Sequence, residues 1–434
     1  MPVRHLPVRP DIHSLEHEAT KLHDAMLRGD ADAAADLARF HPHSPALSNV
    51  TPDDARLTLA RSYEAVDWSR LQLACELIEA IWNNDVAMVR ALVQRRPCLV
   101  HENTGIRKNY NWGPPLSYAA NLGRDEVILA LHDLGAKDLA FALNRAVLQS
   151  RIGTATMLHK MLGAPRPDSS AFGDAAYTLS VSGTEFLFSV GGQLRNADGL
   201  PDAPIDVVLQ TDSRKPVAKH AILDMYAAHG FALPDTPLMA LHRGRLDLLE
   251  PHLDRDPGLL HRTFTHAEIF PAALKCHQPA PGSYDEALPR TPLEGTTLLH
   301  MCVEFDELEI ARWLLQRGAR ADTPAAVDTL GFGGHTALFN AVVSYANFWM
   351  NFTGGWDGTQ KPDQATFAEL LLDHGANANA RASFREPVGE DDARAFVDHR
   401  DVTPLVWGDA FRDRMVVSAP AMRAIEARGG VRTG

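Results

Sequence analysis

The sequence predicts an all-α protein, a solenoid of stacked helical hairpins with long inserted loops and a helical N-terminal cap. Three observations lead to this prediction. One unit of two short helices recurs along the chain, its copies open with Thr or Pro, and they close with Gly-Ala or a similar glycine turn. Self-similarity of this kind is typical of repeat proteins, whose units stack in a row.

The N-terminal segment lacks the repeated unit but has helix signals. Residues 14–40 and 51–80 are predicted to be helical, with a turn at Gly29-Asp30 and a helix start at Thr51-Pro52-Asp53-Asp54. We therefore expect residues 1–66 to form a helical capping region and residues 67–434 to form the array.

The clearest copy of the unit is TLLHMCVEFDELEIARWLLQRGA, from Thr297 to Ala319. Further copies occupy residues 114–136, 236–253, 336–376 and, at the end of the chain, TPLVWGDA with MRAIEARGG. In the openers with the sequence TPL, Thr caps the first helix and Pro occupies its first turn, and the closing Gly takes a left-handed conformation that ends the second helix. The stripe Leu308, Ile310, Ala311, Leu314 and Leu315 is too large for one hairpin to bury, so neighbouring units must stack.

These openers and closers resemble the T-P-L-H and L-L-x-x-G-A motifs of the ankyrin repeat. The match is strong at Thr297 and Pro114 and good at Thr236, whereas the last two copies are interrupted. Degenerate copies at 141–162, 175–190 and 204–229 fill the gaps, which gives roughly seven to nine units. The resemblance implies an ankyrin-type solenoid and a function in binding.

Five insertions depart from a minimal array. Residues 102–113, 261–295, 320–335 and 377–402 fall between a closer and the next opener, and residues 345–364 fall between two helices of one unit. In the ankyrin geometry the first four are fingers on the concave side. Loops longer than about 12 to 15 residues usually serve a function or are disordered, and the aromatic residues here favour function.

Composition limits the partners and the compartment. The 42 basic and 55 acidic residues give a formal charge of −13, and the sequence contains no basic tract of the kind that binds phosphates. We therefore expect no nucleic-acid partner and a weak preference for neutral or basic partners. No signal peptide and no run of about 18 apolar residues occur, so we expect no membrane partner and a cytoplasmic protein. Four cysteines without a CxxC pair indicate a reducing compartment, and scarce Lys beside frequent Arg and Ala indicates a bacterial gene.

Candidate site residues come from the fingers and from the positions just before the inter-helix turns. The resemblance places these positions on one concave surface, where aromatic walls and a few polar groups suit a ligand. The predicted ligand-binding residues are Asn109, Tyr110, Trp112, Tyr118, Asn121, His242, Arg243, Arg245, His266, His277, Glu304, Phe305, His335 and Asn340.

Two functional hypotheses follow. The first is a recognition module whose concave groove holds a protein segment or a small molecule. The second is an enzyme-like pocket in which His242 is the acid or base and Arg243 or Arg245 pairs with an anionic substrate. Cys276 is a further candidate, as a nucleophile with His266 or His277 as its base.

No cofactor motif is present, and the spacing of the histidines and Cys276 matches no zinc pattern, so we expect neither a cofactor nor a metal. If His242 faces the groove, its replacement by alanine should leave thermal stability nearly unchanged and weaken ligand retention.

Overall fold

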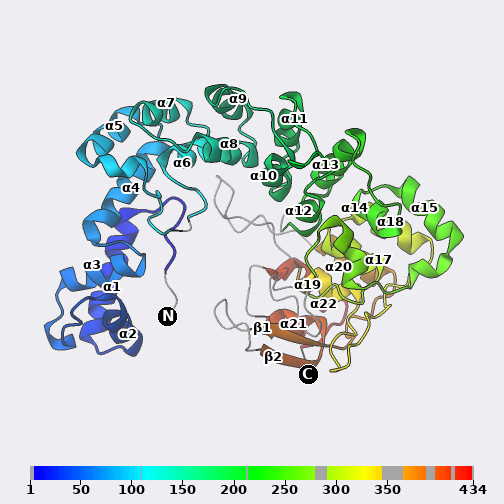
Figure 1. Ribbon diagram of the computed structural model, residues 1–434. Helices are drawn as coiled ribbons and strands as arrows, with labels where there is room; N and C mark the ends of the chain where they lie inside the picture. Colours follow the sequence, from blue (N-terminus) through cyan, green and yellow to red (C-terminus); the bar gives the residue numbers. More distant parts are fainter. Residues whose placement is uncertain are drawn as a thin grey trace. The chain divides into compact units, whose positions relative to one another are not determined.

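The computed structural model describes residues 4–108, 110–211, 214–278, 291–344, 365–387, 396–411 and 416–432 (Figure 1). These residues form two compact units, unit 1 up to Arg166 and unit 2 from Pro167 onward. The predicted boundary between cap and array at residue 66 falls inside unit 1, between two helices, and stays a prediction.

Unit 1 is helical, as the sequence predicts for residues 14–40 and 51–80 and for the copies of the unit at 114–136 and 141–162. Asp30 caps the second helix by accepting from the backbone N–H groups of Asp32 and Ala33, and Thr51 and Asp54 form a capping box at the third. A break near Glu64, whose φ is 64°, divides the predicted 51–80 segment into two helices. The α-helices are α1 Ile12–Leu27, α2 Ala31–Phe40, α3 Pro52–Ser62, α4 Trp68–Trp82, α5 Val86–Arg95, α6 Pro115–Leu122, α7 Asp125–Asp133, α8 Leu139–Leu148 and α9 Ile152–Met161.

Unit 2 repeats the helical hairpin, and its two strands lie in one finger. The helices are α10 Phe172–Tyr177, α11 Val181–Ser189, α12 Ile205–Gln210, α13 Pro216–Ala228, α14 Pro237–His242, α15 Leu246–Arg255, α16 His266–Ile269, α17 Leu298–Glu304, α18 Leu308–Gln316, α19 Ala337–Val342, α20 Ala365–Asp373, α21 Pro404–Ala410 and α22 Ala419–Ala427. The strands are β1 Ala382–Pro387 and β2 Phe396–Val402. The prediction of an all-α solenoid is confirmed.

The openers and closers act as the sequence predicts. The side chain of Thr236 accepts from the Met239 N–H, and that of Thr403 accepts from the Val406 N–H. Gly135 and Gly318 have φ values of 99° and 100°, the left-handed conformation that ends the second helices. These local signals explain why the hairpins begin and end where they do.

The core runs along the row of hairpins. All residues of α17 are buried, because this first helix packs against α19 on one side and α18 on another. In α18 only the stripe of Ile310, Ala311, Leu314 and Leu315 is buried, while Leu308 is half-buried. In unit 2, α10 contacts α12 and α11 contacts α13, so first helices line one face and second helices the other (Figure 1).

Two fingers of unit 2 meet edge to edge. Strands β1 and β2 pair antiparallel with Phe384 opposite His399, and a bridge from Gly333 to Ser383 attaches the 320–335 finger to β1. The 345–364 insertion, with Trp349 and Trp356, lies outside the described residues, as do residues 279–290 of the 261–295 finger.

Candidate functional site

A buried ion pair joins the loop between α12 and α13 to the end of α17. The Arg214 Nη2 lies 2.8 Å from Glu304 Oε1, and these side chains are 3% and 0% exposed. Arg214 also donates from Nε to the Glu304 carbonyl at 2.9 Å and from Nη1 to the Thr211 carbonyl at 2.7 Å. A paired, hydrogen-bonded guanidinium of this kind fixes two chain segments against each other.

A second buried charge group lies one turn further along the chain. Glu307 Oε1 is 2.9 Å from Lys219 Nζ and 2.8 Å from His220 Nε2. Burial favours the neutral acid, but the nearby Lys219 and His220 outweigh it and hold the pKa of Glu307 below its usual value. The turn at Gly244 lies directly against the His220 ring, since a Cβ there would be 2.1 Å from His220 Cε1.

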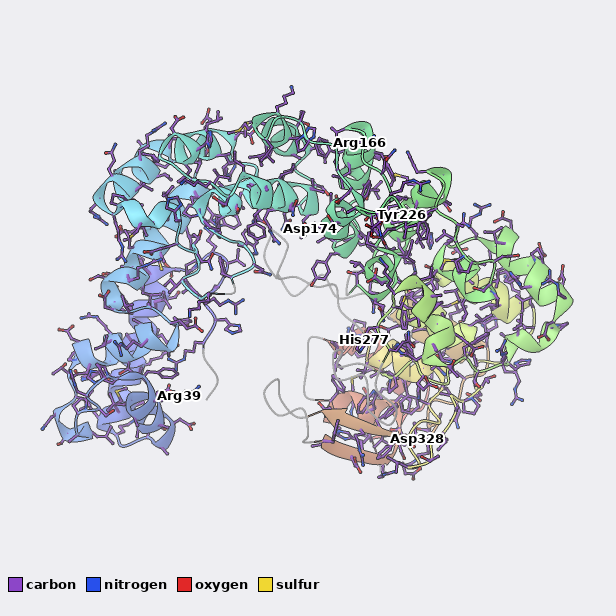
Figure 2. All side chains as sticks on the ribbon, in the orientation of Figure 1. Arg39, Arg166, Asp174, Tyr226, His277 and Asp328 are labelled. Atoms are coloured by element: carbon purple, nitrogen blue, oxygen red, sulfur yellow. The ribbon has the colours of Figure 1, made fainter. Side chains whose placement is uncertain are left out.

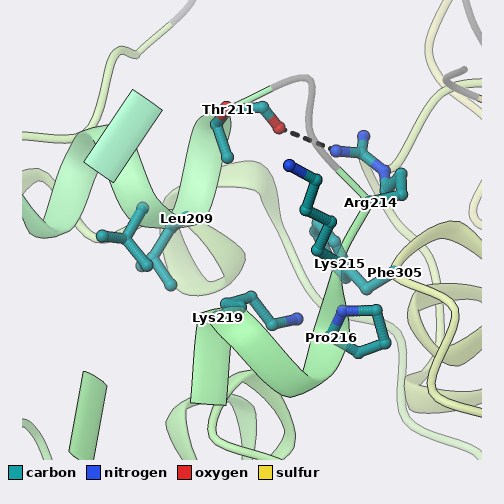
Figure 3. A pocket seen from close by; sticks show the side chains of 8 residues that line it. Leu209, Thr211, Arg214, Lys215, Pro216, Lys219 and Phe305 are labelled. Carbon is teal, nitrogen blue, oxygen red and sulfur yellow. Dashed lines mark hydrogen bonds between the residues drawn. The ribbon is translucent and has the colours of Figure 1, made fainter. Parts of the chain in front are cut away.

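Phe305 forms the wall of a small pocket beside these charges (Figure 3). Its ring centroid is 4.7 Å from Lys219 Nζ and 5.4 Å from Arg214 Cζ, which are cation–π distances. Lys215 donates to the Thr178 carbonyl at 3.1 Å, and burial lowers its pKa. The pocket has room for about one water molecule. Its lining residues are Val208, Leu209, Thr211, Arg214, Lys215, Pro216, Lys219 and Phe305.

His242 packs inside unit 2. Its side chain is buried, its Nε2 lies 3.3 Å from the Ile269 carbonyl, and its ring meets Phe305 edge-on at 4.9 Å. Burial, together with the charge of Lys219, lowers the pKa of His242 to about 3. A neutral, buried imidazole does not reach solvent, so the structure gives no support for an acid–base role.

This burial reverses the expected effect of removing His242. We expect His242→Ala to lower the free energy of unfolding by about 2–4 kcal/mol, because it leaves a cavity beside Phe305. Arg245→Ala, which changes an exposed ion pair with Asp247, should cost less than about 1 kcal/mol. Urea unfolding of both variants measures this, and equal stabilities would show that the His242 ring contributes nothing to the packing.

The predicted residues of the 261–295 finger lie near His242. Phe270 links them, with ring centroids 5.0 Å from His266 and 6.2 Å from His242. His266 Nε2 lies 3.0 Å from the His277 carbonyl oxygen, and the His277 backbone N–H donates to Gln210 Oε1 at 2.8 Å. Cys276 is buried, and burial raises the pKa of its thiol to about 12, so the thiolate that a nucleophile needs does not form near neutral pH.

The predicted anion-binding arginines are engaged in local ion pairs. Arg243 Nη2 lies 2.6 Å from Asp224 Oδ1, and Arg245 bonds Asp247 two residues on. Both pairs lie outside the pocket at Phe305. The structure therefore brings Glu304, Phe305 and His242 together, but not Arg243 or Arg245 with them.

His335 and Asn340 belong to the next hairpin. His300 Nδ1 lies 2.8 Å from Thr297 Oγ1, and His300 Nε2 lies 3.0 Å from the His335 carbonyl oxygen. His335 Nε2 in turn lies 2.9 Å from the Pro292 carbonyl oxygen. These contacts tie one opener to the next finger. Asn340 is fully buried, and its side-chain oxygen and nitrogen have no hydrogen-bond partner among the described residues.

Three buried histidines predict an acid-sensitive fold. Burial lowers the pKa of His300 to about 4 and, with the charge of its neighbour His300, that of His335 to about 3, as it does for His242. The unfolded chain takes up these protons near pH 6.5, whereas the folded chain does not. Stability is therefore full above pH 6.5 and falls as the pH drops toward 4, by up to about 1.4 kcal/mol per pH unit for each histidine.

Urea unfolding at pH 7.5, 6 and 5 checks this dependence. The variant His335→Gln should show a shallower loss than the unmodified chain. A stability that stays constant from pH 7.5 to 5 would mean that these imidazoles are protonated in the folded protein.

The predicted residues of unit 1 form a separate buried set. Trp112 and Tyr118 are packed at 5.0 Å, and Tyr118 accepts from Trp82 Nε1 at 2.7 Å and donates to the Val8 carbonyl at 2.5 Å. Asn121 accepts from Arg145 Nε at 2.9 Å. Tyr110 is also buried, and Asn109 lies outside the described residues. These contacts stabilise the hairpins of unit 1.

The tip of the 320–335 finger is an ordered turn. The Asp328 carboxylate, labelled in Figure 2, accepts from the Leu330 N–H at 2.8 Å and the Phe332 N–H at 2.9 Å. Phe332 is buried beneath Arg400 and Arg385, whose guanidinium carbons lie 3.6 and 4.5 Å from its ring centroid. Arg400 also donates to the carbonyls of Leu330 and Gly331 at 3.1 and 3.2 Å.

Two apolar side chains remain outside this packing. Val327 and Leu330 are 61% and 57% exposed although they lie on an ordered finger. These two side chains are candidates for contact with a partner protein, and Arg400 lies beside them. We call Val327, Asp328, Leu330 and Arg400 the finger tip.

Sequence reasoning missed the cationic half of the buried cluster. Arg214, Lys215, Lys219 and His220 place four basic residues within seven positions of a chain poor in Lys. This local concentration was the available signal. The carboxylate partners of Arg214 and His220 are 90 and 87 residues away in sequence, so the sequence alone did not show the pairing.

Among the described residues, no group of three or more His, Cys, Asp or Glu side chains could hold a metal ion. The helices of the described segments include none with the length and apolarity to cross a membrane.

Comparison with known proteins identifies one segment. Residues 294–329, which contain α17, α18 and the start of the finger, match the family model of the ankyrin repeat. Two solved structures are similar. The ankyrin repeat domain of Bcl-3 is 16% identical, the match covers 66% of this chain and 97% of that chain, and the TM-score is 0.22. The human ASB11 ankyrin repeat domain is 13% identical, the match covers 82% of this chain and 99% of that chain, and the TM-score is 0.21. No curated protein matches significantly.

Proposed function

Since this chain contains an ankyrin repeat at residues 294–329 within a row of similar hairpins, we propose that it is a recognition module that holds a segment of a partner protein. Ankyrin repeats generally serve in protein–protein interaction, and stacked hairpins offer an extended surface for it. We assign the contact with the partner to the finger tip.

The observation that carries this assignment is the exposure of Val327 and Leu330 on an ordered turn. An apolar side chain that stays in water on a fixed backbone loses little conformational entropy when a partner covers it. The guanidinium of Arg400, held over Phe332, adds a planar donor group at the same place. A partner segment with apolar side chains and a carboxylate fits these groups.

The small-molecule alternative depends on the groove residues predicted from sequence. Of these, Glu304, Phe305 and His242 are buried together, and Asn340 and His335 are buried in the next hairpin. Burial favours a packing role for them, so the finger tip supports the protein-binding proposal better than these residues support a small-molecule one.

A double charge substitution at the finger tip tests the proposal. We expect Val327→Asp with Leu330→Asp to weaken binding of a captured and purified partner at least about tenfold, because two buried carboxylates would oppose the contact. The matched control replaces Val66 and Leu200, which are 63% and 60% exposed elsewhere, with Asp. Partner affinity is measured by titration calorimetry. An unchanged affinity in the finger-tip variant, or an equal loss in the control, contradicts the assignment.

A further inference from the structure

We propose that unit 1 carries a binding site for an extended basic segment of a partner protein, and that residues 4–10 of this chain occupy the site until such a segment replaces them. Residues 4–10 lie outside any helix or strand and contact residues of α2, α3, α4 and α6 (Figure 1). The site lies within unit 1 and shares no residue with the finger tip.

The hydroxyl group of Tyr118 is a fixed donor to the backbone of this segment. Trp82 Nε1 donates to Tyr118 Oη at 2.7 Å, and Tyr118 Oη donates to the Val8 carbonyl at 2.5 Å. Because the indole N–H occupies a lone pair of the oxygen, the hydroxyl proton is left to donate to the carbonyl. The Tyr118 side chain is buried, so this proton needs an acceptor. Every peptide has backbone carbonyls, so a partner segment supplies the same group.

Arg9, the next residue of the segment, binds a carboxylate and an aromatic ring. Its Nε and Nη2 donate to the two carboxylate oxygens of Glu79 at 3.0 and 2.8 Å. Its Cζ lies 5.1 Å from the centroid of the Trp82 ring, a cation–π distance. A bidentate carboxylate beside an aromatic ring favours arginine over lysine. The Arg9 and Glu79 side chains are 49% and 47% exposed, so this pair contributes little stability and the arginine can exchange.

Arg4 occupies a second acidic position, five residues earlier. Its Nη2 donates to Asp36 Oδ2 at 2.9 Å, its Nη1 donates to Ser62 Oγ at 3.2 Å, and its Nε lies 3.6 Å from Glu18 Oε1. Its backbone N–H donates to the Ser62 carbonyl at 2.9 Å. The Asp36 side chain is only 5% exposed, and a carboxylate buried to this degree favours a cation as its neighbour.

The residues between the two arginines alternate in burial. Leu6 and Val8 are half-buried, and Leu6 packs against the hydrophobic core of unit 1, whereas His5 and Pro7 are exposed. This alternation is typical of an extended segment with one side on a surface. The ligand is therefore a segment with two arginines five residues apart and apolar residues at the second and fourth positions after the first arginine. The carboxylates at both ends of the site match such a basic segment in charge.

The test is binding of an acetylated, fluorescein-labelled peptide with the sequence of residues 4–10 to the full chain, measured by fluorescence anisotropy. We expect the double variant Arg4→Ala with Arg9→Ala to bind the peptide at least about tenfold more tightly than the unmodified chain, because its own segment, at an effective concentration of about 1 mM, no longer competes. The matched control is His5→Ala with Pro7→Ala, two exposed positions of the same segment, and it should bind as the unmodified chain does.

Two further peptides test the specificity of the site. A peptide with both arginines replaced by glutamine, and a scrambled peptide of unchanged composition, should each bind the double variant at least about tenfold more weakly. If the double variant does not fold, Arg9→Ala alone, which removes only the exposed ion pair, should still bind the peptide more tightly than the unmodified chain.

Three results would overturn the proposal. The first is equal peptide affinity of the folded double variant and the unmodified chain. The second is equal affinity for the scrambled peptide, which would mean that only the overall charge attracts it. The third is a dimer of the unmodified chain in analytical ultracentrifugation that the double variant lacks, since the segment would then belong to a second copy of this chain.

Discussion

Replacing Glu307 with alanine should lower the free energy of unfolding by about 3–5 kcal/mol, the largest effect expected of a single charge change in this protein. The reason is the ammonium of Lys219, which is buried and has Glu307 as its ion-pair partner. Removal of the carboxylate leaves this cation, and the shared His220, without compensation in the interior.

Urea unfolding at pH 7.5 measures the effect, and Glu309→Ala is the matched control. Glu309 lies two residues away in the same repeat and pairs with Arg312 on the surface, with its side chain 77% exposed. Its removal should cost less than about 1 kcal/mol. If the two variants lose the same stability, the Lys219 ammonium is solvated rather than buried.

Gly244→Ala should also lower the free energy of unfolding, by about 2–4 kcal/mol. Its φ of +64° is a left-handed conformation that disfavours a Cβ, and that Cβ would lie 2.1 Å from the His220 ring. His220 is held in turn by Glu307, so the ring does not move aside without loss of that contact.

Gly230→Ala separates the two causes. Gly230 has a φ of +86°, but a Cβ there meets nothing within 4 Å, so its replacement reports the backbone cost alone, about 1 kcal/mol. A Gly244→Ala variant as stable as Gly230→Ala would show that His220 does not lie against this turn.

The fold was largely predictable because its signals are local. Thr236 and Thr403 cap helices and Gly318 ends one, and each of these roles depends on a few adjacent residues. The antiparallel strands within the 377–402 finger were not predicted, because no turn motif that would indicate a hairpin and its register is recognisable between them.

The candidate site was less predictable because it depends on contacts between distant segments. His242 has the spacing of a groove residue, but the aromatic rings of Phe270 and Phe305 enclose it. Likewise, Arg214 and Glu304 become a buried pair only when two hairpins are placed side by side. Burial of a polar residue on a short first helix is set by its neighbours in the row, which a single sequence does not specify.

Hydrogen–deuterium exchange of the protein alone and with its captured partner tests the central claim, recognition of a protein segment by the finger tip, most directly. We predict slower exchange of the backbone amides in residues 325–335 and 396–402 when the partner is bound. Slower exchange confined to the second helices α18, α20 and α22, with the fingers unchanged, would contradict it.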